Sequence, residues 1–197
     1  MTYLLVGLIV LGVVGYFGLP HIFTALGMHP HYELPEDLNV LGGRALVIST
    51  SHDTLGDTGK KTGVYASEMT APYYAFLDSG MEVTVASVQG GEIPIDPGSF
   101  TWFLISDADK RFQKDETFQK AVKSSVSVTD LNGADFDIVF LAGGWGAAYD
   151  MGTSPEVGRV VTEAWNANNV VGGFVMGRWG CCWQRTNLVS RSPKVGS

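Results

Sequence analysis

Apolar and polar residues follow one another in blocks along this chain, and the blocks predict strands and helices in regular succession. Short, apolar, β-branched runs are typical of buried strands, and they occupy residues 44–50, 81–88, 137–142 and the stretch from 170 onward. The amphipathic or capped stretches between them predict helices at 64–79, 115–124 and 154–168. Strands that are apolar throughout and alternate with helices indicate a parallel sheet covered on both faces, so the fold class is α/β.

Local signals place some of these boundaries. Ser154 is an N-cap residue followed by Pro155 at the first helical position, and Gly80 is a natural stop for the preceding helix. Pro72 interrupts the helix at 64–79, and a residue before proline is biased away from helical geometry. We therefore expect Glu68 to lie on a separate turn or short helix. The helix at 115–124 is expected to be polar and exposed.

The N-terminal segment is a separate unit. Residues 3–19 are all apolar or glycine, and after Pro20 and His21 apolar residues resume. Because a bilayer core takes roughly 20 apolar residues as a helix, residues 1–28 are predicted to be an uncleaved, single-pass membrane anchor. The alternatives are a signal peptide or a buried helix. Arg44 is the first basic residue, so a basic signal region is missing and the membrane orientation cannot be set. Residues 29–43 form a polar linker to the domain.

Composition narrows the classes of function. The chain has 197 residues and 45% hydrophobic content, enough for one core-bearing domain. A net charge of −7 argues against nucleic-acid binding, which needs a basic surface. The cysteines are adjacent, at 181 and 182, and cannot form a disulfide framework. His21, His29 and His31 lack metal-ligand spacing with any carboxylate or cysteine cluster, so no metal site is predicted.

Two features carry candidate chemistry. Glu68 lies in an otherwise neutral stretch, where burial would raise the pKa of its carboxyl and suit it to proton exchange; a solvated glutamate on a helix face is the plainer alternative. Gly143 and Gly144 follow directly on a strand, where glycine amides can stabilise an oxyanion; a tight turn that needs positive φ is the alternative. His52 and Asp53, in a loop after the first strand, are more simply polar surface.

Three ordered motifs resemble the ThiJ/PfpI superfamily, which has the class I glutamine-amidotransferase-like fold. They read TGVYASEMTAPYYAF at 62–76, GGEIPIDPGS at 90–99 and DIVFLAGGWGAAYD at 137–150. The branch they are most similar to is that of glutathione-independent glyoxalases and heat-shock chaperones. The resemblance covers residues 44–173 and implies a flavodoxin-like parallel sheet with helices on both faces, incomplete at the C-terminus.

The resemblance also implies an active site. Glu68 matches the acidic partner of the family, and the backbone of Gly143 and Gly144 matches its oxyanion donors. The family then places a Cys-His-Gly turn after the strand that begins at Val170, where a thiolate attacks a carbonyl. Here Val175 and Met176 stand at the Cys and His positions, and neither can act as nucleophile or base. The resemblance therefore implies an enzyme without its catalytic pair, and it implies no cofactor.

The chain changes character at Phe174. Residues 174–197 contain no Asp or Glu, yet hold both cysteines and two of the five tryptophans. When the codons of this stretch are read one nucleotide earlier, they permit Cys-His-Gly-Pro-Leu-Gly-Leu-Leu-Leu-Ala, and five of these ten residues are forced by the genetic code. We therefore interpret 174–197 as an out-of-frame, truncated tail; a divergent, non-catalytic C-terminus is the alternative.

Three functions follow as hypotheses. The first is a membrane-anchored enzyme that converts a small reactive dicarbonyl to a hydroxy acid or hydrolyses a related adduct, inactive as written. The second is a chaperone or interaction module on the same fold. The third, a glutamine amidotransferase, is the weakest, because it needs an ammonia-accepting partner and a glutamine site. The resemblance is also compatible with a homodimer.

Overall fold

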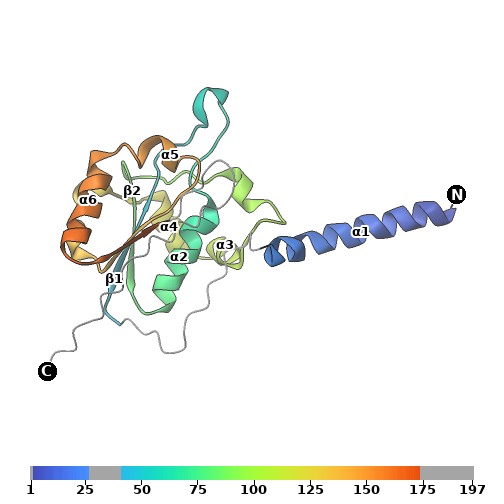
Figure 1. The fold of residues 1–197 in the computed structure, drawn as a ribbon, viewed down its shortest axis with the longest axis horizontal. Coiled ribbons are helices and arrows are strands. Elements are labelled where there is room, and N and C mark those ends of the chain that lie inside the picture. Colours follow the sequence, from blue (N-terminus) through green and yellow to red (C-terminus); the bar gives the residue numbers. More distant parts are fainter. Residues whose placement is uncertain (1, 27–40, 174–197) are drawn as a thin grey trace.

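A parallel sheet forms the centre of the domain in the computed structural model, which describes residues 2–26 and 41–173 (Figure 1). Within these residues, five strands run in the order β3-β2-β1-β4-β5, and every neighbouring pair is parallel. Their bounds are β1 Arg44–Ser49, β2 Glu82–Ser87, β3 Val126–Ser127, β4 Ile138–Leu141 and β5 Val170–Gly173. The predicted α/β, flavodoxin-like architecture is confirmed, with β1 at the centre.

Helices connect the strands and cover both faces of the sheet (Figure 1). The α-helices of the domain are α2 Ala66–Asp78, α3 Asp107–Phe112, α4 Glu116–Lys123, α5 Ala147–Asp150 and α6 Pro155–Asn166. Short 3-10 helices are η1 Gly56–Thr58, η2 Pro97–Phe100, η3 Val128–Asp130 and η4 Gly133–Asp135. The Ser154 side chain accepts a hydrogen bond from the Val157 amide at 3.2 Å, so the predicted cap of α6 is confirmed.

The alternation of side chains along β1 divides the core into two layers. Val47 points to one face of the sheet, where it joins a cluster contributed mainly by α2 and α4. Leu46 and Ile48 point to the other face, where they pack with residues of α6. All three side chains are fully buried, as expected for the middle strand of a sheet with covered faces.

The expected break in the helix at Pro72 is wrong. α2 is continuous from Ala66 to Asp78, with Pro72 inside it and Glu68 in its first turn. Proline removes one hydrogen bond from a helix interior, but Tyr73 and Tyr74, directly after Pro72, are buried in the core. This burial holds the helix together despite the local preference against it.

The helix at 115–124 is also less exposed than expected. α4 begins after Asp115, whose side chain accepts from the Phe118 amide at 3.0 Å. Phe118 is fully buried, and its ring stacks on Tyr73 with centroids 3.5 Å apart. The polar sequence of α4 therefore conceals a narrow apolar face that attaches the helix to α2.

The N-terminal segment forms a single helix, α1 Thr2–Ala25, which extends away from the domain (Figure 1). Its residues Val6–Ala25 are long and apolar enough to cross a membrane by length and composition. A signal sequence near the N-terminus passes the same test. The apolar helix is thus confirmed, while its membrane placement stays a prediction.

Candidate active site

The loop after β4 lies directly against the segment that leads into α2. The Tyr65 amide donates a hydrogen bond to the Gly143 carbonyl at 3.3 Å, and the Gly146 amide donates to the Gly63 carbonyl at 3.0 Å. Glu68 follows one helical turn after Tyr65. Two of the sequence-predicted site features, the glycine pair and the glutamate, are therefore brought to the same edge of the sheet, beyond the carboxyl ends of its strands.

Gly144 is required by geometry at this contact. Its φ is +122°, a backbone conformation that favours glycine, and a Cβ there would lie 2.4 Å from the Tyr65 amide nitrogen. Among the described residues, no hydrogen bond is formed by the Gly144 N–H. A tight turn that needs glycine and an amide that binds an oxyanion are thus compatible interpretations. The close packing requires glycine at position 144 and, within the described part of the chain, leaves its N–H free to donate to a ligand.

The motif at 90–99 supports the start of α2. Val64 and Ile95 form a parallel bridge, and the Asp96 carboxylate accepts from the Thr62 hydroxyl at 2.9 Å. The buried Ser99 hydroxyl accepts from the Ala66 amide at 2.9 Å. Because the first amides of a helix lack partners within it, Ser99 caps α2 from a distant part of the chain.

Glu68 is a carboxyl group in a poorly solvated place. Its Oε2 atom is buried and has no hydrogen-bond partner among the described residues. Burial raises the pKa of Glu68 to about 7 from an ordinary value of 4.5. The group can therefore hold or release a proton near neutral pH. The pKa of the neighbouring Tyr65 is also raised, first by burial and then by the charges of Asp109 and Glu68.

α2 is held in position from its other side by α3. The Thr70 hydroxyl donates to the Asp109 carboxylate at 2.7 Å, and both residues are fully buried. Asp109 also accepts from the amide and the hydroxyl of Ser106. This network fixes the first half of α2, which carries Glu68.

A second group of polar residues closes the same edge above β1. The Asp150 carboxylate accepts from the Thr50 hydroxyl and from the Ser51 amide, both at 2.7 Å. The His52 ring stacks on Tyr149 with centroids 4.4 Å apart. His52 is thus part of a packed loop and not simply polar surface, while Asp53 makes an exposed ion pair with Lys61.

Several of these residues were not expected from the sequence. Ser99, Asp96 and Asp150 act through partners that lie 33, 34 and 100 positions away along the chain. Hydrogen bonds between residues so far apart in the sequence produce no local pattern from which they could be predicted. The positions Val175 and Met176, and both cysteines, lie outside the described residues.

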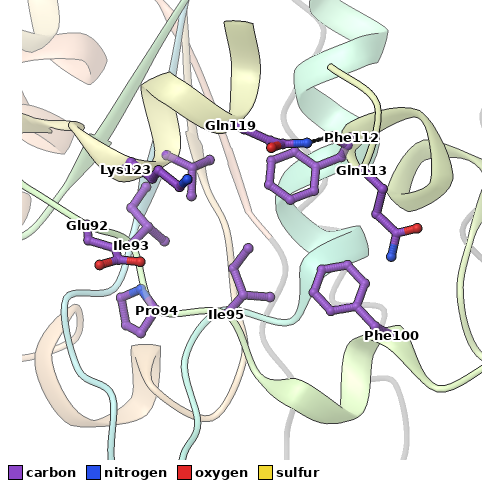
Figure 2. Close-up of a pocket in the computed structure, with 10 residues that line it drawn as sticks. Glu92, Ile93, Pro94, Ile95, Phe100, Phe112, Gln113, Gln119 and Lys123 are labelled. Atoms are coloured by element: carbon purple, nitrogen blue, oxygen red, sulfur yellow. Dashed lines mark hydrogen bonds between the residues drawn. The ribbon is translucent and has the colours of Figure 1, made fainter. Parts of the chain in front are cut away.

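The pocket drawn in Figure 2 does not coincide with this site. It has a volume of about 390 Å³, and it is lined by apolar and polar side chains of the 92–95 segment, Phe100, the end of α3 with Gln113, and α4. Neither Glu68 nor Gly144 lines it. Within the described ranges, no group of three or more His, Cys, Asp or Glu side chains is placed to hold a metal ion.

Comparison with known proteins supplies the context for this geometry. A family model described as the DJ-1/PfpI family matches residues 61–182. The chain is 27% identical to glyoxalase 3 of Candida albicans over 67% of its own length and 56% of that protein. It is 26% identical to the glutathione-independent glyoxalase hsp3102 of Schizosaccharomyces pombe, over 69% of its own length and 58% of the relative. The chain thus spans somewhat more than half the length of these relatives.

Solved structures show the same fold. The rapid encystment protein of 24 kDa from Francisella tularensis superimposes with a TM-score of 0.62 and 33% identity, over 66% of this chain and 57% of that one. Glyoxalase III from Candida albicans gives a TM-score of 0.60 and 27% identity, over 66% and 56% of the two chains. The predicted family resemblance is confirmed by both kinds of comparison.

Proposed function

Because the chain belongs to the DJ-1/PfpI family, we propose that it carries the acidic and oxyanion-binding parts of a dicarbonyl-converting site on a domain anchored to a membrane. The observation that carries the proposal is the position of Glu68, a half-buried residue whose Oε2 atom is buried, one turn from the Tyr65–Gly143 hydrogen bond. Relatives named as glutathione-independent glyoxalases indicate a small reactive dicarbonyl, such as methylglyoxal, as the substrate class.

The chemistry follows from the groups at the sheet edge. A thiolate from a Cys-His-Gly turn would attack the aldehyde carbon, and the Gly143 and Gly144 amides would stabilise the resulting oxyanion. Glu68, whose pKa is raised by burial to about 7, would exchange protons with the reacting groups near neutral pH. The overall reaction adds water, oxidises the aldehyde carbon and reduces the ketone carbon, so it needs no external oxidant.

In the chain as written, the nucleophile is missing. Val175 and Met176 occupy the positions of the thiol and its histidine partner, and their side chains cannot attack a carbonyl or accept a proton. We therefore propose that this chain is inactive towards dicarbonyls and that its reading frame is interrupted before Phe174. The α1 helix would hold the domain at a membrane through Val6–Ala25.

Two measurements test this proposal. Sequencing the coding DNA across codons 168–197 should reveal one inserted or deleted base that restores Cys-His-Gly. The repaired chain should then consume methylglyoxal and produce lactate, the chain as written should not, and Glu68→Gln in the repaired chain should lower turnover by about 10² to 10⁴-fold. An intact frame, or a repaired chain that only suppresses aggregation, would favour an interaction or chaperone role instead.

A further inference from the structure

An apolar loop lies beside α1 on the surface of the domain. Residues 102–105 read Trp-Phe-Leu-Ile, and no charged residue occurs from 97 to 106. The Trp102 side chain is 41% exposed, and Phe103, Leu104 and Ile105 are half-buried. The loop joins η2 to α3 and lies on the side of the domain from which α1 extends (Figure 1).

Aromatic rings connect this loop to the helix. Tyr16 of α1 stacks on Trp102 with ring centroids 4.1 Å apart and an angle of 25° between the planes. One loop position further, Phe103 and Phe23 stack at 5.3 Å and 24°. Tyr16 and Phe23 both belong to the C-terminal half of the apolar span Val6–Ala25. The loop therefore follows the apolar helix over about two turns.

The helix is partly covered near its C-terminal end. Residues 18–20 and Phe23 are half-buried, whereas residues 6–17, all of them apolar or glycine, are exposed. The exposed part is too large an apolar surface to face water. At about 1.5 Å per residue, the exposed residues 6–17 extend over about 18 Å, so they can enter a bilayer while Tyr16, close to the end of this exposed part, stays near the membrane surface. A membrane that receives the exposed part of α1 therefore comes close to Trp102.

We propose that residues 101–105 insert into the interfacial layer of the same membrane that receives α1, with Trp102 as the interfacial ring. The inference rests on the membrane anchoring proposed above. Tryptophan and tyrosine favour this layer, because their rings combine an apolar body with a polar atom. The loop has no charge, so a neutral lipid surface is sufficient and the contact is insensitive to salt.

Insertion of the loop would also orient the domain. The loop continues into α3, whose Asp109 is hydrogen-bonded to Thr70 of α2. α2 carries Glu68 in its first turn. The membrane contact is therefore connected through buried polar bonds to the helix that bears the candidate acid, and the site edge is held at a fixed angle to the bilayer.

Depth-dependent quenching in vesicles tests the proposal. The full chain, with Cys181→Ser and Cys182→Ser, is labelled with an environment-sensitive fluorophore at Trp102→Cys or at Leu104→Cys and reconstituted in neutral phosphatidylcholine. The Leu104 variant keeps both stacked rings, so it decides the matter if the Trp102 variant does not fold. Trp165→Cys is the matched control, since Trp165 is 61% exposed and lies on α6, on the opposite side of the domain from α1 (Figure 1).

Brominated lipid should quench the labels at 102 and 104 about twofold at low and at high salt, and should leave the label at 165 unchanged. Flotation of the vesicles reports separately on anchoring by α1. If the chain floats but 104 is no more quenched than 165, the loop proposal is overturned while the anchor stands. If the labels are shielded from water but are not quenched by brominated lipid, a protein surface covers the loop. That result would also overturn the loop proposal. A chain that does not float would overturn both proposals.

Discussion

The Tyr65 amide donates to the Gly143 carbonyl at 3.3 Å, and this bond joins two segments that are 78 positions apart in the sequence. It brings the start of α2, with Glu68 in its first turn, against the glycine loop that follows β4. Close backbone approach, rather than contact between the polar side chains, thus assembles the candidate site. All variants of this arrangement are compared in the full chain in the same detergent.

Gly144→Ala should be strongly destabilising. The new Cβ would lie 2.4 Å from the Tyr65 nitrogen, and a backbone atom cannot move aside as a flexible side chain can. The φ of +122° adds strain, so we expect a loss of about 2 to 4 kcal/mol in the free energy of unfolding. Urea denaturation followed by circular dichroism measures it.

Gly158→Ala is the matched control for that substitution. Gly158 lies inside α6, and a Cβ there meets no atom within 4 Å. Alanine should stabilise the chain by about 0.5 to 1 kcal/mol, because it has the higher helix propensity. Equal effects of the two substitutions would contradict the close approach at Gly144.

Stability should fall as pH rises through the titration of Glu68. The pKa of Glu68 is raised by burial to about 7 in the folded chain, against 4.5 when the group is solvated. Between these values the folded state holds a proton that the unfolded state releases. Stabilisation is therefore complete below pH 4.5 and is lost as pH approaches and passes 7, by about 2 to 3 kcal/mol for this group.

Glu68→Gln isolates this contribution. Glutamine is nearly isosteric with the protonated acid and cannot ionise, so the variant should be the more stable protein at pH 8 and should lose its advantage at pH 5. The difference in denaturation midpoint between variant and parent, measured at several pH values, cancels the other titrating groups. A difference that does not change with pH would show that Glu68 is solvated.

Ser99→Ala should weaken the start of α2. The hydroxyl accepts from the Ala66 amide, and Ser99 is 1% exposed, so the amide would lose its partner in a place that water cannot reach. We expect a cost of about 1 to 2 kcal/mol. Ser127→Ala removes a comparable bond to the Thr129 amide at the exposed start of η3, and it should cost less than about 0.5 kcal/mol.

Much of the fold could be predicted because its signals are local. The apolar runs that became β1, β2 and β4, and the Ser154 cap with Pro155, are determined by neighbouring residues. The break at Pro72 was predicted from an equally local signal and was wrong, because burial of the adjacent tyrosines outweighs the lost hydrogen bond.

The site was only partly predictable, because some of its residues carry a local signal and others act through distant partners. Glu68 stood out as a charge in a neutral stretch, and Gly143 and Gly144 stood out as a pair after a strand. The residues that position them, such as Ser99 and Asp109, act on partners more than 30 positions away. Only the folded sheet edge shows which polar groups meet there.

The proposed role of Glu68 depends first on its protonation state near neutral pH. Carbon-13 labelling of the glutamate carboxyl groups, with Glu68→Gln to assign the resonance, gives its titration curve by NMR. We predict a midpoint near 7, since burial disfavours the charged form. A midpoint near the ordinary 4.5 would contradict the buried carboxyl and, with it, the proposal that Glu68 exchanges protons at this site.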